Sequence, residues 1–279
     1  MIEVHAAAIN PIDWVITAGH MQQMLPYELP WTVGYDVSGV VVEVGSDASG
    51  IAVGNEVFAR ADGMQAGTMA EYAALKATDL ALKPSNITHV EAAGVPLAGL
   101  TAWQALFDKG QLTEGQRVLI HAGSGGVGTL AIQFAKNAGA WVATTASVAN
   151  RGLVERLGAD QFVDYKTERF EDAVEPCDLV FDMMGGETLR RSFDVVKPGG
   201  TIVSIKGEAP EGLAAERNIA FHPFFMQPNG EQLSEIAALI SGGVVNPVLD
   251  STYPLDDVAE AYRYAQSGGP NGKVAIAIR

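Results

Sequence analysis

The sequence predicts an α/β protein in which a β-rich segment precedes a doubly wound parallel sheet. Three observations carry this prediction. Short apolar runs separated by Gly and Pro fill the first 95 residues, which is typical of a barrel or sandwich-like unit. After Pro96, strand patterns alternate with helical patterns, and such alternation implies parallel strands joined by right-handed crossovers. Strand-like segments return near the C-terminus, from Val245 onward.

The β-rich segment is best defined at Val37–Val44, where β-branched residues are dense and Gly34 and Gly45 mark the ends. Turn residues separate the other short runs in the same way. The further predicted strands are Ile2–Ile9, the second half of Gly50–Arg60, Glu71–Leu75 and Asp79–Lys83.

Helical spacing predicts a helix over Leu97–Phe107, where the alternation of strands and helices begins. The strands predicted after it are Arg117–His121, Trp141–Thr145, Phe162–Val163, Leu179–Met183, Thr201–Ile205, Val245–Leu249 and Lys273–Ile278. The helices predicted between and after them are Val127–Asn137, Ala149–Leu157, Glu187–Val196, Glu231–Ser241 and Asp257–Ala265, with a loop at 221–229.

Composition narrows the function classes. Hydrophobic residues make up 48% of 279 residues, enough for a packed core and too many for a disordered chain. A net charge of −15 repels nucleic acid and anionic lipid, so neither is expected as a partner. No apolar run reaches the roughly 18 residues of a membrane-spanning helix. The single cysteine, Cys177, fits a reducing cytoplasm and argues against a structural zinc site.

The strongest motif is VLIHAGSGGVG at residues 118–128, which lies directly after an apolar strand and before an amphipathic helix. Its glycines satisfy the GxGxxG pattern of dinucleotide-binding turns. Gly123 allows the tight turn, Gly125 the approach of a pyrophosphate, and Gly128 close packing of helix on strand. The helix start at Gly126 and Val127 presents free N–H groups to the phosphates.

The identity of the dinucleotide follows from the end of the second strand of this unit. An NAD site usually has Asp or Glu there for the ribose hydroxyls, whereas this strand ends in TTASVANR, residues 144–151. Ser147 is a small donor suited to a 2′-phosphate, and Arg151 is a candidate phosphate clamp. The sequence therefore favours NADP(H) over NAD(H).

Six strings along the chain carry a family resemblance. They occur in the expected order and cover nearly all of the sequence, which resembles the medium-chain dehydrogenase/reductase superfamily, and within it the zinc-independent quinone oxidoreductase branch that includes zeta-crystallin. The strings are NPIDW (10–14), VGYDVSGVVVEVG (33–45), VGNEVFA (53–59), PLAGLTAWQALF (96–107), VLIHAGSGGVG (118–128) and FDMMGGETLRRS (181–192).

The resemblance implies a Rossmann domain inserted in a β-rich GroES-like domain, with the active site in the cleft between them. The expected substrate domain comprises residues 1–96 and 243–279, and the NADP-binding domain residues 97–242. Members usually carry a β-hairpin before the strand that holds HAAAIN, and this sequence starts within that strand. The expectation is therefore a member that lacks one hairpin.

Zinc-dependent relatives place Cys, His and Glu at positions where this sequence has Asn10, Tyr35 and Asp36. Asn and Tyr are poor replacements for soft zinc ligands. The resemblance therefore implies hydride transfer without metal. Without a metal, NADPH can still reduce a quinone or an activated C=C, because the anion that develops is delocalised.

The resemblance also assigns site residues. Asn10 and Tyr35 are the catalytic candidates, and Asp13 is expected to order the loop. The cofactor residues implied are Asn10 and Thr101 at the nicotinamide, Gly123, Gly125, Gly126, Val127 and Gly128 at the pyrophosphate, Ser147, Arg151 and Tyr165 at the 2′-phosphate, and Phe225 at the carboxamide.

The proton donor stays open between water, His20 and Tyr35, because the cleft tyrosine of several quinone reductases is Met21 here. An apolar substrate cleft is expected from Met21, Met24, Trp31 and Phe224–Met226.

The leading hypothesis is a cytoplasmic, homodimeric NADPH-dependent reductase that acts on a small hydrophobic quinone or enone. The alternatives are a non-catalytic NADPH-binding protein and, less well supported, a zinc-type alcohol dehydrogenase.

Overall fold

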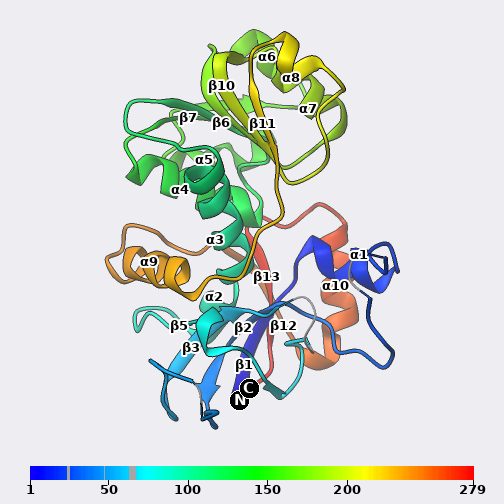
Figure 1. Ribbon diagram of the computed structural model, residues 1–279, viewed down its shortest axis with the longest axis vertical. Helices are drawn as coiled ribbons and strands as arrows, with labels where there is room; N and C mark the ends of the chain where they lie inside the picture. Colours follow the sequence, from blue (N-terminus) through cyan, green and yellow to red (C-terminus); the bar gives the residue numbers. More distant parts are fainter. Residues whose placement is uncertain (24–25, 47, 63–66) are drawn as a thin grey trace. The chain divides into compact units, whose positions relative to one another are not determined.

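The computed structural model of the protein describes residues 1–23, 26–46, 48–62 and 67–279 (Figure 1). The chain divides into two compact units. Unit 1 comprises Met1–Leu100 and Gln227–Arg279, and unit 2 comprises Thr101–Met226. Unit 2 is therefore inserted in unit 1 along the sequence. Met24, expected in the substrate cleft, lies outside the described residues.

Unit 1 is built on a seven-stranded sheet with the order β12-β13-β1-β2-β3-β5, in which β4 pairs with β1. All described pairings are antiparallel except that of β12 with β13. The strands are β1 (Ile2–Ala8), β2 (Asp36–Val41), β3 (Glu56–Arg60), β4 (Tyr72–Ala73), β5 (Leu80–Leu82), β12 (Leu249–Pro254) and β13 (Lys273–Ala277).

Strand β1 contributes to three apolar clusters of unit 1. Ile2 and Val4 pack with Val37 and Val57, whereas Ala7 packs in a second cluster with residues of β13 and the last helix. The register of β1 against β2 shifts between Val4 and Ala6. A bulge of this kind shifts the alternation of side chains between the two faces of the sheet by one residue.

The helices of unit 1 are short and cover the sheet. They are α1 (Pro11–Thr17), η1 (Ala77–Asp79), α2 (His89–Ala93), α3 (Pro96–Trp103), whose last residues lie in unit 2, α9 (Gly230–Ser241), η4 (Leu255–Asp257) and α10 (Val258–Gln266). Helix α2 begins with a capping box, in which Thr88 and Glu91 satisfy each other's backbone N–H groups.

Helix α9 was expected in the NADP-binding domain, which was predicted to end at 242, but it belongs to unit 1. The Asn86 amide donates to the Ile240 carbonyl at 2.9 Å. Gly230 lies so close to Thr78 that a Cβ there would be 2.5 Å from the Thr78 carbonyl oxygen. An amphipathic pattern shows that a helix has an apolar face but not which sheet covers it, so the sequence placed this boundary too late.

Unit 2 is a parallel six-stranded sheet with the order β11-β10-β9-β6-β7-β8. Numbered within the unit, this is the 3-2-1-4-5-6 order of a doubly wound dinucleotide-binding sheet, read from the other edge. The direction of winding reverses between β6 and β9, and ligands bind beside the carboxyl ends at such a point. The strands are β6 (Arg117–Ile120), β7 (Trp141–Ala146), β8 (Gln161–Asp164), β9 (Cys177–Asp182), β10 (Val196–Ser204) and β11 (Ala220–Pro223).

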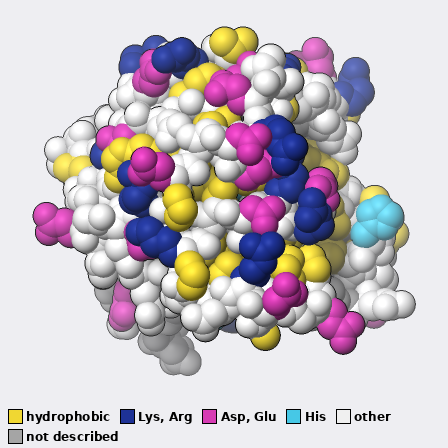
Figure 2. All heavy atoms as spheres, turned by 90° about the horizontal axis from the view of Figure 1, so that it is seen from above, with side chains coloured by type: hydrophobic (Ala, Val, Ile, Leu, Met, Phe, Trp, Pro, Cys, Tyr) yellow, Lys and Arg dark blue, Asp and Glu magenta, His cyan; other side chains and the backbone are white. Residues whose placement is uncertain are grey.

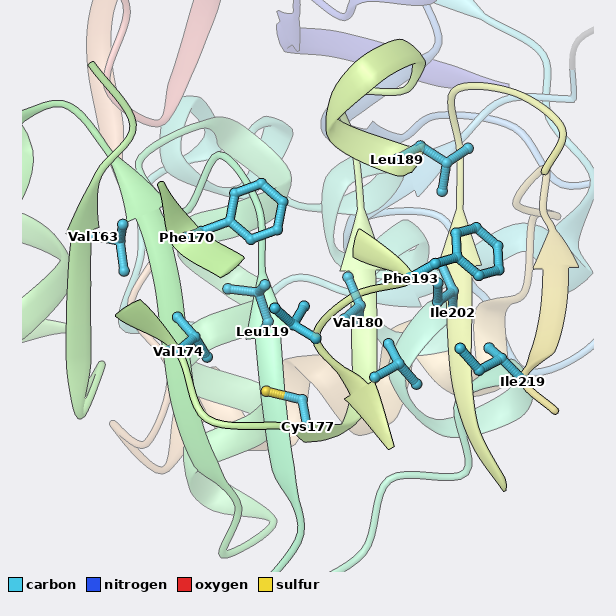
Figure 3. Packing of buried hydrophobic residues seen from close by; sticks show 13 residues of the cluster. Leu119, Val163, Phe170, Val174, Cys177, Val180, Leu189, Phe193, Ile202 and Ile219 are labelled. Carbon is cyan, nitrogen blue, oxygen red and sulfur yellow. The ribbon is translucent and has the colours of Figure 1, made fainter. Parts of the chain in front are cut away.

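One face of this sheet is packed by a dense apolar cluster (Figure 3). Leu119 and Val180 from the central strands lie under Phe170, Leu189 and Phe193 from the helical side. All five side chains are buried, which is the apolar burial expected of a parallel sheet covered on its faces. The helices of unit 2 are the π-helix η2 (Gln104–Lys109), α4 (Gly126–Asn137), η3 (Val148–Asn150), α5 (Arg151–Arg156), α6 (Phe170–Ala173), α7 (Gly186–Ser192) and α8 (Leu213–Glu216).

Several predicted elements differ from the structure in their bounds, most clearly in three places. The strand expected at Val245–Leu249 begins only at Leu249, after Pro247. The helix expected to reach Val196 ends at Ser192, and Val196 already starts β10. The predicted loop at 221–229 begins with edge strand β11. The first two errors sit at boundaries, where neighbouring strands rather than local pattern decide the conformation, and the third is a short edge strand without a strong pattern of its own.

The surface charges are mixed rather than segregated on the face seen in Figure 2, where Lys and Arg lie among Asp and Glu. Ion pairs such as Arg190 with Glu187 and Arg169 with Asp172 follow helical spacing on α7 and beside α6. None of the described helices is both long enough and apolar enough to cross a membrane.

Candidate cofactor and active site

The turn after β6 has the backbone geometry of a phosphate-binding loop. Ala122 adopts a left-handed conformation with φ of 54°, and Gly125 caps α4, which begins at Gly126. Two backbone bonds fix the turn: Gly123 N–H donates to the Thr145 carbonyl at 3.0 Å, and Gly125 N–H donates to the Ala122 carbonyl at 3.0 Å. The first N–H groups of α4, including those of Gly126 and Val127, lie at the positive end of a twelve-residue helix.

The three glycines of the motif are required for different reasons. A Cβ on Gly123 would lie 1.9 Å from the Thr144 hydroxyl, and one on Gly128 would lie 2.3 Å from the Ala122 carbonyl. Packing within the protein therefore excludes any side chain at both positions. A Cβ on Gly125 would meet only the Ala122 oxygen, at 3.4 Å. Since the described residues leave room there, the approach of a ligand to the backbone is the remaining physical reason for this glycine.

The turn after β9 lies beside the turn after β6, because the two strands are neighbours at the point where the winding reverses. Asp182 ends β9 and is fully buried. Its carboxylate accepts the N–H groups of Met184 and Gly185 at 3.1 Å and the Ser204 hydroxyl at 2.7 Å. Asp182 therefore shapes the second turn. In the sequence Asp182 stands out only as part of the FDMMGGETLRRS motif.

Ser147 and Tyr165 come together because β7 and β8 are parallel and in register. Ala146 pairs with Asp164, so the next residue of each strand lies at the same sheet edge, and Tyr165 N–H donates to the Ala146 carbonyl at 3.3 Å. Tyr165 is 60% exposed, and the Lys166 ammonium lies 5.9 Å from its ring centre. Lys166 is a cation that sequence reasoning missed. Its position directly after the third strand of the unit was the available signal.

Arg151 is the first residue of α5, close in sequence to Ser147. Its side chain is 62% exposed, and its Nε donates to Glu155 at 2.8 Å. Its guanidinium also lies 5.6 Å from the ring centre of Phe162. The Asn150 amide donates to the Ser124 hydroxyl at 3.1 Å, which ties this edge to the turn after β6.

Asn10 lies in a buried polar network of unit 1. Its amide donates to Asp36 at 2.8 Å and more weakly to the Ala8 carbonyl, and its side-chain oxygen accepts from the Lys273 ammonium. Lys273 also donates to the Ile9 carbonyl at 2.9 Å and pairs with Asp36 at 3.2 Å. All three side chains are at most 7% exposed. The network fixes Asn10 rigidly and gives Asp36 a positive partner.

The second oxygen of Asp36 accepts the backbone N–H of Leu97 at 2.7 Å. Asp13, on the first turn of α1, accepts the Asn10 N–H at 2.7 Å and so orders the loop that carries Asn10. Burial raises the pKa of Asp13 to about 7, which the bond from Asn10 and the charge of Lys273 only partly offset. Asp13 is therefore close to its midpoint at neutral pH.

Tyr35 precedes β2 and is 2% exposed. Its hydroxyl has no hydrogen-bond partner among the described residues, and the Arg60 guanidinium lies 5.0 Å from its ring centre. Burial raises the pKa of Tyr35 to about 12, although the charge of Arg60 opposes the rise. The phenol therefore stays protonated at neutral pH.

The remaining predicted site residues are less informative. Thr101 is buried in α3, and Phe225, which follows β11, is 51% exposed. His20 is exposed. Trp31 packs between the rings of Tyr27 and Tyr35, at 5.1 and 6.4 Å, which gives it a structural role in unit 1.

Among the residues compared above with zinc ligands, Asn10 and Asp36 are both bound within the network of unit 1. The side-chain oxygen of Asn10 already binds a lysine ammonium, whose positive charge would repel a second cation. The described residues contain no group of three His, Cys, Asp or Glu side chains that could hold a metal ion.

Two family models match the chain. The Alcohol dehydrogenase GroES-like domain covers residues 1–85, and the Zinc-binding dehydrogenase model covers residues 157–276. The chain is 38% identical to a 2-methylene-furan-3-one reductase of Solanum lycopersicum, over 99% of this chain and 71% of the relative. It is 37% identical to a chloroplastic NADPH-dependent alkenal/one oxidoreductase of Arabidopsis thaliana, with the same coverage.

Solved structures agree with these relatives. The quinone oxidoreductase of Coxiella burnetii matches with a TM-score of 0.88 and 34% identity, over 100% of this chain and 90% of that one. An alcohol dehydrogenase superfamily protein of Novosphingobium aromaticivorans matches with a TM-score of 0.92 and 33% identity, over 100% and 91%. The chain belongs to the quinone oxidoreductase branch of the medium-chain dehydrogenase/reductase superfamily.

Proposed function

We propose that the protein is an NADPH-dependent reductase that transfers a hydride to a quinone or to the activated C=C bond of an enone. The observation that supports dinucleotide binding is the geometry of the turn after β6. At this turn Gly125 leaves room for a ligand, and α4 presents its first N–H groups. The names of the relatives supply the substrate class, since they act on furanones, alkenals and quinones.

The preference for NADPH over NADH rests on the carboxyl ends of β7 and β8. Ser147, Tyr165 and Lys166 follow these two strands, and Arg151 starts the next helix. Hydroxyls and cations suit a 2′-phosphate, whereas the carboxylate that would bind a free ribose hydroxyl is missing at the end of β7. These four residues are the proposed 2′-phosphate site.

We further propose that the reaction needs no metal. When bound, NADPH supplies the hydride, and the charge that develops on the substrate is spread over an enolate or hydroquinone oxygen. The buried network of Asp36 and Lys273 holds the Asn10 amide in one orientation. Tyr35 keeps its phenolic proton at neutral pH, so it is a candidate for returning a proton to the substrate.

The experiment is oxidation of NADPH by the purified protein against a panel of quinones, enones and alkenals, in the presence of a chelator. Turnover of at least one substrate class is expected. Tight binding of NADPH without turnover across the panel would instead support a non-catalytic binding protein. Activity lost on chelation and restored by zinc would support a zinc-type dehydrogenase.

A homodimer and a cytoplasmic location are also proposals. Strand β11 is an edge of the six-stranded sheet, and paired edges of two copies would continue that sheet. Light scattering gives the mass in solution. A monomer at micromolar concentration would reject the dimer.

A further inference from the structure

His121 directly follows β6, at the start of the phosphate-binding turn, and is 1% exposed. Both of its ring nitrogens have partners. Nδ1 lies 3.1 Å from the Thr145 hydroxyl, and Nε2 lies 3.0 Å from the Ser192 hydroxyl on α7. Neither the glycine motif nor the proposed chemistry accounts for a buried histidine at this place.

The surrounding groups determine where the protons lie. Ala122 N–H donates to the Thr145 hydroxyl oxygen at 3.1 Å, so the Thr145 proton is free to point at Nδ1. The Ser192 hydroxyl donates to the Thr188 carbonyl at 2.8 Å, so its oxygen is free to accept from Nε2–H. In this assignment every proton finds an acceptor. In the reverse tautomer, the Thr145 proton would have no acceptor among the described groups.

Electrostatics keeps the ring neutral. Burial lowers the pKa of His121 to about 4, and the nearby Arg191 lowers it further, while Asp182 opposes the shift. Asp182 and Arg191 are the charged groups that act on this ring. A neutral ring with one donor and one acceptor is what the two hydroxyl partners require.

The hydrogen bonds form a directed relay from Ala122 N–H through Thr145, His121 and Ser192 to the Thr188 carbonyl. Ala122 is the residue of the turn with a left-handed backbone, which is unfavourable for a side chain other than glycine and must be held by its surroundings. The far end of the relay lies on α7, which follows β9. The relay therefore spans the two strands between which the winding reverses.

We propose that His121 is a positioning residue for the cofactor: as its neutral Nε2–H tautomer it holds the phosphate-binding turn through Thr145 and anchors that turn to α7 through Ser192. This inference rests on the proposed dinucleotide function. The turn binds the pyrophosphate, which NADPH and NADH share. Loss of a hydrogen bond in the relay therefore lowers the affinity for both dinucleotides equally, whereas a change at the 2′-phosphate site affects NADPH alone.

The test compares dissociation constants for NADPH and NADH in four variants, with thermal unfolding as a control. Thr145→Val removes the hydroxyl without changing the shape, and we expect both constants to rise about ten-fold. Thr145→Ser keeps the hydroxyl and is expected to bind within about two-fold of wild type. Ser192→Ala removes only the hydrogen bond between His121 and α7. It is expected to raise the dissociation constants of both dinucleotides by less than Thr145→Val does.

Ser38→Ala is the matched control. Ser38 is a buried hydroxyl 2.8 Å from a histidine nitrogen, His89 Nδ1, but it lies in unit 1. It is expected to lower stability while leaving both dissociation constants unchanged. If Thr145→Val lowers stability as Ser38→Ala does and leaves both constants unchanged, His121 has no positioning role. A rise for NADPH alone would also overturn the proposal.

A second measurement needs no cofactor. Nitrogen NMR of the ring in the wild-type protein is expected to show a protonated Nε2 and an unprotonated Nδ1 near neutral pH. The opposite tautomer, or a ring that protonates above pH 6, would overturn the relay. If the wild-type protein binds neither dinucleotide while the expected tautomer is found, the proposed function fails and the relay stands as a structural device alone.

Discussion

The two polar sites of the molecule are built in opposite ways. The site in unit 2 is built largely on backbone: a glycine turn, the start of α4 and strand ends, with Gly125, Gly126 and Val127 partly exposed. The site in unit 1 is made of side chains: Asn10, Asp36 and Lys273 form a network sealed from water.

The distribution of charge follows the same division. Unit 2 holds 12 of the 18 basic residues, so most of the excess negative charge belongs to unit 1 and not to the unit that carries the proposed phosphate-binding turn. The basic residues of unit 1 are Arg60, Lys76, Lys83, Arg263, Lys273 and Arg279. The turn after β6 depends on the space around its backbone, whereas removal of one partner from the buried ion pair of unit 1 leaves the other charge uncompensated.

The largest effect is expected from Lys273→Met. It leaves Asp36 buried without its cation, and such a change costs about 3–5 kcal/mol of stability. Chemical denaturation measures the loss. Lys76→Met is the control, because the ion pair of Lys76 with Asp62 is exposed and contributes little to stability. Equal losses in the two variants would show that the unit 1 network is not a sealed ionic site.

Two glycine variants separate space needed for packing from space needed for a ligand. Gly123→Ala is expected to destabilise the protein by about 1–3 kcal/mol, because its Cβ meets the Thr144 hydroxyl. Gly125→Ala is expected to keep stability within about 0.5 kcal/mol, since the protein offers no clash, and to weaken dinucleotide binding. Denaturation and cofactor titration on both variants give the answer. Unchanged cofactor affinity in Gly125→Ala would show that the pyrophosphate does not bind at this turn.

The pH dependence of stability tests the burial of Asp13, whose carboxylate binds the backbone of Asn10 in unit 1. The pKa of Asp13 is about 7 in the folded protein against a usual value of 3.8, so the folded state holds an extra proton between these values. Its contribution to stability is therefore present at low pH and is lost as the pH rises from about 4 to about 7, with a slope of up to about 1.4 kcal/mol per pH unit. Asp13→Asn is expected to remove that slope. Parallel stability curves for wild type and Asp13→Asn would contradict the burial of a titrating carboxyl.

The smallest expected effects lie at the 2′-phosphate site. Lys166→Ala and Arg151→Ala are each expected to raise the dissociation constant of NADPH about ten-fold, because one charge-assisted bond is lost. The dissociation constant of NADH is expected to stay unchanged. Arg156→Ala, on the same helix as Arg151, is the control. Dissociation constants for both cofactors measure the change. An equal loss of NADH affinity would assign these cations to the shared part of the cofactor.

The sequence predicted the parts of the molecule that depend on local pattern. The glycine turn, the alternating strands and the insertion of one domain in another followed from spacing and family motifs. The parts that depend on long-range contact did not. Asp36 and Lys273 are 237 residues apart, and no periodicity connects them. The relay through His121 was missed for the same reason, because its partners Thr145 and Ser192 belong to elements that only the sheet order brings together.

The most direct test of the central claim is transfer of deuterium from NADPH that carries deuterium at both C4 positions of the nicotinamide to an enone, with a chelator present. The account predicts one deuterium at the β-carbon of the reduced product and faster transfer from NADPH than from NADH. Unlabelled product, or label transfer only after zinc is added, would contradict it.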